Sequence, residues 1–352
     1  MHSTTKPWRV GVCGCGSSID LYEGIQHHHE SFQFVAAADL HIERAQKAAR
    51  QWGRDNYYDD VTQMLDQEKP DLLIIATPPD NHLETAVEAA ARGVHLLIQK
   101  PLACSVAEGE KIIDSCEKNH CGLKVSFARR YYPAFQKAYE LINDSGQGLL
   151  LRCTWNSTSG WKDRPNKQWK KERKTRGGVL VDLGSHVIDL SRWWMGEPAG
   201  CRLAMSVVKG ELDNIAEFIV NHKGGGITRG SLSNVAFAEN EAYEYIGTGG
   251  GLVLERTCGG YPGSWNLTRY RHDAPTEQWS FGASTCPSDP DTNPFILEMV
   301  DYISQLQQDR ILIDPFDLGY KTLELTSVLY KSSTQRDSMD LDDFSIDGFF
   351  KV

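Results

Sequence analysis

The sequence predicts an α/β protein in which a doubly wound parallel sheet is followed by an α+β domain with a large, open and mainly antiparallel sheet. Three observations support this prediction. Short apolar runs alternate with helical periodicity over the first hundred residues, strand-like runs between glycine or asparagine turns dominate after about residue 124, and the 352 residues exceed what one hydrophobic core usually covers. We therefore expect a first domain over residues 1–124 and a second over residues 125–352.

Four short apolar runs in the first domain have the composition of buried strands: residues 9–13, 32–38, 71–76 and 94–98. Between them, residues 43–50 and 84–92 show the periodicity of amphipathic helices, and Gly93 ends the second of these helices. Strand–helix–strand units of this length imply parallel strands that are joined by right-handed crossovers. They are the basis for predicting a doubly wound sheet.

The second domain has a different pattern, with strand-like runs and few helices between them. The runs cover residues 149–155, 201–209, 215–221, 228–236 and 252–256. Such spacing is typical of an antiparallel sheet, and the three glycines at 224–226 predict a hairpin between two of its strands. Helical patterns return over residues 295–308 and 318–332, and we expect the last helix to pack back on the first domain.

The composition argues against several classes of protein. Acidic residues outnumber basic ones by 47 to 37, which gives a net charge of −10, whereas nucleic-acid-binding proteins normally carry a basic excess. No apolar stretch is long enough to span a bilayer, and residues 1–8 lack the apolar core of a signal peptide. The nine cysteines are scattered without C-x-x-C spacing. We expect a cytoplasmic protein with neither a disulfide framework nor a metal site.

A glycine turn after the first strand is the first candidate functional feature. Gly14 and Gly16 stand where a strand is expected to open into a helix, and Asp39 closes the second strand at the distance typical of a dinucleotide-binding fingerprint. Asp39 would accept hydrogen bonds from a ribose and repel a 2′-phosphate, which favours NAD over NADP. Ile19 replaces the third glycine, and the alternative is a plain tight turn. The candidate cofactor-binding residues here are Gly14, Cys15, Gly16, Ser17, Ser18 and Asp39.

Further motifs together resemble those of one enzyme family. Thr-Pro-Pro-Asp-Asn-His at 77–82, Gln-Lys-Pro at 99–101, Phe-Ala-Arg-Arg at 127–130 and Asp-Leu-Gly-Ser-His at 182–186 resemble the glucose–fructose oxidoreductase/inositol dehydrogenase/MocA family. The resemblance runs over residues 10–190 and returns near 294–295 and 330–332. It implies an N-terminal Rossmann domain, a C-terminal domain with an open antiparallel sheet, and reversible hydride transfer between a nicotinamide and a sugar or cyclitol hydroxyl.

The resemblance also implies roles for individual residues. The family's Glu-Lys-Pro motif falls on residues 99–101, and its lysine, here Lys100, projects toward nicotinamide and substrate. Gln99 replaces the usual glutamate and removes a negative charge beside Lys100, and Ala128 stands where many members have asparagine. The remaining implied contacts are Thr77, Pro78, His82, Gln99 and Lys100 for the cofactor and Arg129 for the substrate.

The Asp-x-x-x-His pair of the family falls on Asp182 and His186. Histidine titrates near neutrality, so His186 can take the proton of a hydroxyl and return it in the reverse direction. If the segment is helical, residues four apart share a face, and Asp182 would orient the imidazole. Lys100 could polarise the same oxygen. The alternative is that His186 simply packs within a helix whose N-terminal charge is Asp182.

A basic, tryptophan-bearing segment lies just before this pair, over residues 161–176. An indole face suits the apolar face of a sugar ring, and basic side chains suit a carboxylate or phosphate. We therefore predict that Trp161, Lys162 and Arg164 contact the substrate, and that this substrate is an anion. The alternative is a solvated loop or a contact with a neighbouring subunit.

Another tract, His27 to His29, has no acidic or cysteine partner nearby in the sequence and is expected to be a solvated helix end.

Three functions remain open at this point. The first is an NAD-dependent oxidoreductase acting on a sugar, sugar derivative or cyclitol, assembled as a homodimer or homotetramer through the open sheet. The second is a redox-neutral glycosidase or lyase that oxidises the sugar only transiently. The third is a non-catalytic protein that senses the cofactor, which Lys100, Asp182 and His186 argue against.

Overall fold

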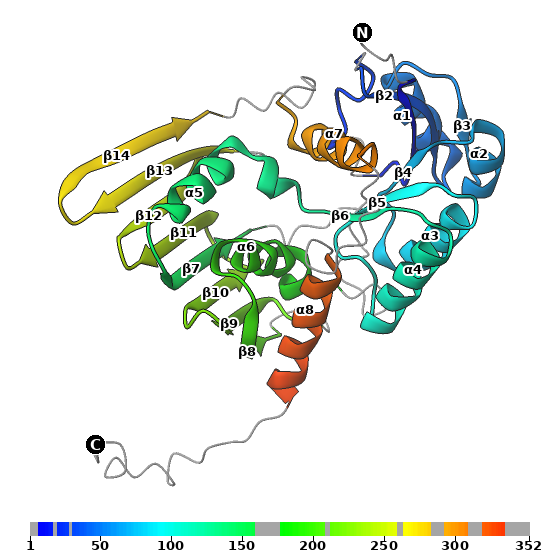
Figure 1. Ribbon diagram of the computed structural model, residues 1–352. Helices are drawn as coiled ribbons and strands as arrows, with labels where there is room; N and C mark the ends of the chain where they lie inside the picture. The colour runs from blue at the N-terminus through cyan, green and yellow to red at the C-terminus, as the bar shows by residue number, and fades with distance from the viewer. Residues whose placement is uncertain are drawn as a thin grey trace.

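Two β-sheets organise the protein in a computed structural model that describes residues 6–16, 20–27, 30–158, 177–207, 212–258, 263–282, 292–308 and 319–334. A six-stranded sheet with helices on both faces lies at one side of the molecule, and an eight-stranded sheet lies at the other (Figure 1). This arrangement confirms the predicted fold class. No helix in the described ranges combines the length and apolar composition that crossing a membrane requires.

The first sheet contains the four predicted strands and two more. Its members are β1 (Trp8–Cys13), β2 (Phe32–Ala38), β3 (Tyr57–Tyr58), β4 (Leu72–Ile75), β5 (His95–Gln99) and β6 (Leu123–Ser126). They run parallel in the order β3-β2-β1-β4-β5-β6. This is the Rossmann order, in which the direction of winding reverses between β1 and β4 and ligands bind beyond the carboxyl ends of these strands.

Alternation of side chains along the strands builds two hydrophobic layers. Leu73 and Ile75 of β4 face α2 (Val61–Glu68), α3 (His82–Ala90) and α4 (Val106–Lys118). Leu72 and Ile74 face the opposite layer, which contains α1 (Ile42–Gln51) and α7 (Pro294–Leu306). One face of the first sheet is therefore covered by a helix that the chain reaches only after the second sheet is complete.

The prediction of a helix directly after the glycine turn is wrong for residues 20–27, which the structure describes. Residue 20 is in a 3₁₀ helix and residues 21–26 form consecutive turns, in which the Ile25 N–H donates to the Tyr22 carbonyl (3.1 Å) and the His27 N–H donates to the Gly24 carbonyl (3.0 Å). Gly24 has a φ of 98°, which interrupts helical geometry. His27 is exposed in these turns rather than at a helix end, and His28 and His29 lie outside the described residues.

The second sheet is mixed but mainly antiparallel. Its strands are β7 (Gly148–Asn156), β8 (Pro198–Ser206), β9 (Ile215–His222), β10 (Ile227–Ser233), β11 (Asn240–Gly247), β12 (Gly250–Cys258), β13 (Ser264–Arg271) and β14 (Ala274–Phe281). The order is β14-β13-β12-β11-β7-β10-β9-β8, and only the pair β7–β10 is parallel. The glycine hairpin between β9 and β10 is confirmed, with the Gly225 N–H donating to the His222 carbonyl (2.9 Å).

Helices cover one face of this sheet. Phe135 of α5 (Pro133–Asn143) and Trp194 of α6 (Ser185–Met195) pack with inward side chains of the strands such as Leu151. The strands also carry outward-facing charged pairs, among them Arg152 with Glu244. Alternation of buried and exposed positions along β9, β10 and β11 shows that the second face is open in the described part of the chain.

Two helices from the end of the chain pack on the first sheet, and one of them, α8 (Gly319–Thr334), also packs on the second sheet. Leu323 of α8 lies in the core with Val125 of β6, whereas Leu325 and Leu329 of the same helix belong to the core of the second sheet. α7 packs on the first sheet. The division near residue 124 stays a prediction, because both helices follow it in sequence and still pack on the first sheet.

Glu298 of α7 holds the carboxyl end of β6. It is buried, and its carboxyl group accepts hydrogen bonds from the Ser126 hydroxyl and the Phe127 N–H (2.8 Å). Burial raises the pKa of Glu298 to about 7, against the opposing effect of the Lys124 charge. The backbone that leaves β6 is therefore fixed by a carboxyl group whose charge is costly to bury.

We expect the stability of the protein to fall between about pH 4.5 and pH 7 because of Glu298. The native state keeps the Glu298 proton up to about pH 7, whereas the unfolded chain loses it near the ordinary pKa of about 4.5, so the stabilisation is complete below pH 4.5 and is lost as the pH rises through about 7. The slope is at most about 1.4 kcal/mol per pH unit. Glu298→Gln should flatten the decline in thermal-denaturation measurements. Glu244→Gln, which changes an exposed carboxylate, is the control, and an unchanged slope in Glu298→Gln would contradict the assignment.

Candidate active site

The carboxyl ends of the parallel strands bring the predicted cofactor residues to one edge of the first sheet. Gly14 follows β1, Asp39 follows β2, Thr77 follows β4, and Gln99 ends β5 directly before Lys100. The edge includes the reversal between β1 and β4, which is where open α/β sheets bind ligands. The sequence motifs therefore converge in space at the position that the topology favours.

The two glycines of the turn differ in what requires them. Gly14 has a φ of +94°, and a Cβ there would lie 2.5 Å from the Ala76 carbonyl carbon and the Thr77 nitrogen, so only glycine fits. A Cβ at Gly16 would meet nothing within 4 Å. Gly16 therefore borders open space at the turn, as expected where a ligand approaches the backbone. Ser17, Ser18 and Ile19 lie outside the described residues.

Asp39 contacts the glycine turn directly. Its Oδ2 accepts the Cys15 N–H (2.7 Å), and its Oδ1 accepts the His41 N–H (2.9 Å). Cys15 contributes its backbone here, because its buried thiol lies 3.5 Å from the Ala38 carbonyl and burial, followed by the Asp39 charge, raises the pKa of that thiol. The fixed carboxylate keeps unused lone pairs that suit ribose hydroxyls.

His82 joins the turns that follow β4 and β5. Its Nε2 lies 3.0 Å from the Thr77 carbonyl and its Nδ1 lies 3.1 Å from the Pro101 carbonyl. The ring is fully buried, and burial lowers its pKa. His82 thus links the Thr77–Pro78 turn to the Lys100–Pro101 turn through the backbone, and direct contact with a cofactor stays a prediction.

Lys100 connects the edge of the first sheet to the segment that leads into α6. Its Nζ donates to the Asp182 carbonyl (2.6 Å) and to Asp182 Oδ1 (3.3 Å). The two side chains are only 14% and 21% exposed. Gln99 turns elsewhere and donates from Nε2 to the Tyr22 hydroxyl (2.7 Å). The carboxylate beside Lys100 is therefore supplied by Asp182, at a site where the sequence has a neutral residue in place of the family glutamate.

The predicted helix over Asp182 and His186 begins with a π-helical turn, Leu180–Gly184, which leads directly into α6. A π-helical turn is wider than an α-helical one and is frequent at functional sites. The expected α-helical register between the two residues therefore does not hold at Asp182. Its carboxylate is directed to Lys100 in the contacts described above.

His186 lies beside two aromatic side chains. Its ring centroid is 5.8 Å from that of Trp155 on β7 and 6.2 Å from that of Phe127, which stands edge-on to it. His186 and Trp155 are each partly exposed. The sequence analysis missed Trp155, although alternation from Leu151 through Cys153 places it on the helix-covered face of the sheet.

Arg129 lies behind Trp155, with its guanidinium carbon 4.0 Å from the centre of the indole ring. It is 7% exposed, pairs with the buried Glu241 and approaches the Tyr243 hydroxyl (3.4 Å). This cation–π contact fixes the indole from within the core. Contact of Arg129 with a substrate stays a prediction. Trp161, Lys162 and Arg164 lie outside the described residues.

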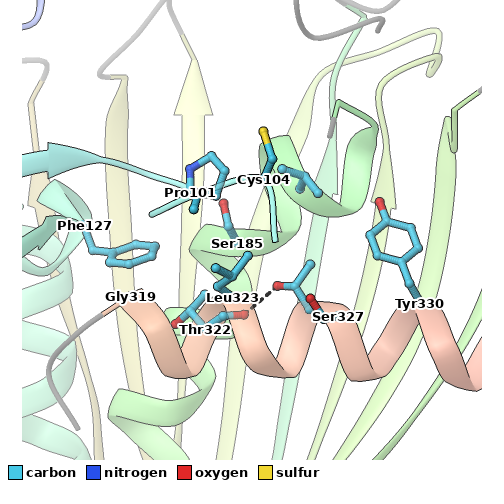
Figure 2. Close-up of a pocket in the computed structure, with 12 residues that line it drawn as sticks. Pro101, Cys104, Phe127, Ser185, Gly319, Thr322, Leu323, Ser327 and Tyr330 are labelled. Carbon is cyan, nitrogen blue, oxygen red and sulfur yellow. Dashed lines mark hydrogen bonds between the residues drawn. The ribbon is translucent and has the colours of Figure 1, made fainter. Parts of the chain in front are cut away.

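A small pocket borders the site on the side of α8 (Figure 2). Pro101 and Ser185, the sequence neighbours of Lys100 and His186, form part of its wall, and Thr322 and Tyr330 of α8 form another part. The backbone that carries the candidate catalytic groups thus lies against this helix. Within the described ranges, no three His, Cys, Asp or Glu side chains are grouped as a metal site requires.

Comparison with known families matches both halves of the chain. Residues 8–127 match the oxidoreductase family with an NAD-binding Rossmann fold, and residues 135–253 match the GFO/IDH/MocA C-terminal domain. The chain belongs to the GFO/IDH/MocA family. This confirms the resemblance drawn from the motifs, and NAD is the cofactor that fits both the family and the glycine turn with Asp39.

The alignments with individual curated relatives cover only part of each protein. Levoglucosan dehydrogenase of Pseudarthrobacter phenanthrenivorans is 30% identical over 172 residues, 48% of this chain and 44% of that protein. The rhizopine catabolism protein MocA of Rhizobium meliloti is 32% identical over 216 residues, 59% of this chain and 66% of that protein. The chain thus spans about half to two thirds of these curated relatives.

A solved structure of levoglucosan dehydrogenase with NADH and levoglucosan has the same fold. It is 21% identical to this chain, with a TM-score of 0.79 over 94% of this chain and 97% of the other.

We expect the two glycines of the turn to respond differently to alanine. Gly14→Ala forces a Cβ against backbone atoms at a positive φ and should destabilise the fold by more than about 1 kcal/mol. Gly16→Ala meets no protein atom, so its thermal stability should stay near that of the wild type while the Kd for NAD, measured by calorimetry, rises about tenfold. Unchanged NAD affinity in Gly16→Ala would show that the open space is not used by the cofactor.

Proposed function

We propose that the protein is an NAD-dependent oxidoreductase that transfers hydride between nicotinamide and a hydroxyl or keto group of a sugar, sugar derivative or cyclitol. The observation that carries this proposal is the Lys100–Asp182 contact, which brings the cofactor edge of the first sheet to the segment bearing His186. A cation and a histidine that can accept and return a proton are groups suited to the oxidation of an alcohol.

The proposed chemistry divides between three side chains. His186 takes the hydroxyl proton as general base and returns it in the reverse direction. The Lys100 ammonium stabilises negative charge on the same oxygen, and Asp182 holds the amine in place. NAD, when bound, supplies the hydride acceptor. These roles are also those implied for the family's Lys and Asp-x-x-x-His motifs.

The cofactor specificity follows from Asp39. Its carboxylate, held by the Cys15 and His41 amides, follows β2, and an acidic residue at this position of a Rossmann fold typically accepts hydrogen bonds from the adenosine ribose. A 2′-phosphate placed there would meet a like charge. We therefore infer that NAD(H) is preferred over NADP(H).

The substrate class is argued from the aromatic surroundings of His186. Trp155 and Phe127 provide apolar surface beside the imidazole, and such surface suits the C–H face of a sugar ring. The related levoglucosan dehydrogenase is named for a sugar derivative. Preference for an anionic sugar rests on the basic sequence that contains Trp161, Lys162 and Arg164.

Assembly and location belong to the same proposal. Ile219, which is 44% exposed, lies with Ile227 on the open face of the second sheet, next to charged pairs such as Arg229 with Glu217. A face of this kind supports a homodimer or homotetramer through the sheet. The cysteines whose side chains the structure describes are free thiols, which accords with a reducing, cytoplasmic environment.

A sugar and cyclitol screen that reads NADH absorbance tests the function. His186→Ala should lower kcat by roughly 10²–10⁴-fold, with the Kd for NAD nearly unchanged, because a general base is lost while the cofactor edge stays intact. Asp182→Asn should lower kcat less. Comparable turnover in folded His186→Ala would remove the histidine from the mechanism, and substrate conversion without net NADH would establish the redox-neutral alternative.

The basic segment should make an anionic sugar a better substrate than its neutral analogue. Added salt should raise KM for the anion more than for the neutral sugar, because exposed charges are screened over roughly 8 Å at physiological ionic strength. The double variant Lys162→Ala with Arg164→Ala should erase this difference and leave NAD affinity unchanged. Better turnover of the neutral sugar at low salt, with a silent double variant, would assign the segment to a solvated loop or subunit contact.

A further inference from the structure

Asp213, two residues before the start of β9, caps the helical segment that carries the candidate catalytic groups. It is only 4% exposed. Its Oδ2 accepts the Leu180 N–H (2.8 Å), and its backbone carbonyl accepts the Val179 N–H (2.9 Å). The first N–H groups of a helix have no partner within the helix, so an acceptor from elsewhere in the chain has to satisfy them when they are buried.

The cap fixes the position of Asp182 along the chain. Leu180 begins the π-helical turn, and Asp182 follows within the same turn. The Asp182 N–H donates to the Gly178 carbonyl (2.9 Å), so the turn is held at its start by Asp213 and at its side by Lys100. A shift of the start of this turn would move the Asp182 oxygens that receive the Lys100 ammonium.

Gly178 shows how closely the two segments approach. Its φ is +109°, and a Cβ at this position would overlap the Asp213 carboxylate. Only glycine lets the backbone pass the carboxylate in this conformation. The close approach indicates that the path of the chain before Asp182 is adjusted to Asp213.

A second contact fastens the same carboxylate to α8. The Tyr330 hydroxyl donates to Asp213 Oδ1 (2.8 Å), so both carboxylate oxygens are engaged by separate elements. Tyr330 also lines the pocket between α8 and the turn after Lys100 (Figure 2). The Asp213 carboxylate therefore joins α8, β9 and the catalytic segment at one buried point.

We propose that Asp213 is a positioning residue, which holds the segment from Val179 to His186 in register with Lys100 and is itself held by Tyr330. The effect of Asp213 on turnover rests on the proposed function, whereas its anchoring of the segment does not. Asp213 touches neither the proposed substrate nor the cofactor edge in the contacts described, so it acts through Asp182 and His186.

Tyr330→Phe tests the proposal with the smallest change, because it removes one hydroxyl. Amide hydrogen exchange measured by mass spectrometry should become faster in the peptide over residues 177–186, and kcat for the sugar found in the screen should fall roughly tenfold, as expected for displaced catalytic groups. The Kd for NAD, measured by calorimetry, should stay unchanged. Ser332→Ala is the matched control, because it removes a hydrogen bond from the same helix to the Leu203 N–H of β8 (3.1 Å).

Two substitutions of Asp213 separate anchoring from burial of charge. Asp213→Asn keeps an oxygen for the Leu180 N–H and an N–H for the Tyr330 oxygen. Its amide hydrogen exchange over residues 177–186 and its kcat should therefore stay close to those of the wild type. Asp213→Ala removes both contacts and should show a larger effect than Tyr330→Phe. An asparagine variant as impaired as the alanine variant would contradict anchoring through these hydrogen bonds.

The outcomes distinguish the anchor from the proposed function. If amide hydrogen exchange over residues 177–186 in Tyr330→Phe is as slow as in the wild type, the anchoring role of Asp213 is overturned. Faster exchange with unchanged kcat, or an equal loss of kcat in Ser332→Ala, would overturn the positioning role. A wild-type protein that oxidises no sugar with NAD would reject the proposed function, and the exchange data would still decide whether Asp213 anchors the segment.

Discussion

The contact between the Lys100 ammonium and the Asp182 carbonyl and carboxylate is the interaction on which the geometry of the site depends. At this contact the edge of the parallel sheet meets the helical segment that leads into α6, which packs on the second sheet. A largely buried amine is well accommodated only when several acceptors replace its lost water, and Asp182 supplies two of them. Everything that fixes either partner therefore also fixes the distance between the two halves of the site.

Most of the remaining contacts serve to fix one of these partners. His82 braces the turn that carries Lys100, because its buried ring lies between the Thr77 and Pro101 carbonyls. On the other side, the π-helical turn presents the Asp182 carbonyl oxygen to the amine. Arg129 and Trp155 form a separate brace, which begins in the buried pair with Glu241 and ends beside the His186 ring. The site is thus assembled from side chains whose rotamers are locked by the core beneath them.

Sequence reasoning found the edge of the first sheet because each motif follows an apolar strand, and parallel strands end at a common edge. It failed where structure depends on distant contacts. The strands β11, β13 and β14 were missed because charged and polar residues interrupt their apolar pattern, as Glu241 and Glu244 do around Tyr243 in β11. The helix after the glycine turn was predicted from local periodicity, which the left-handed Gly24 overrides. Nothing in the motifs could mark Asp213, since its partner Leu180 lies 33 residues away.

The packing of α7 on the first sheet has a consequence for the synthesis of the chain. Val10, Leu72 and Leu97 lie in one hydrophobic cluster with Ile296 and Ile303 of α7, and the whole second sheet is translated between these two sets of residues. The nucleotide-binding half therefore leaves the ribosome with part of one apolar face uncovered, and it can close this core only after the second sheet has been translated. Until then that face is a surface for chaperones or for aggregation, and the long sequence separation makes its closure a late and slow event in folding.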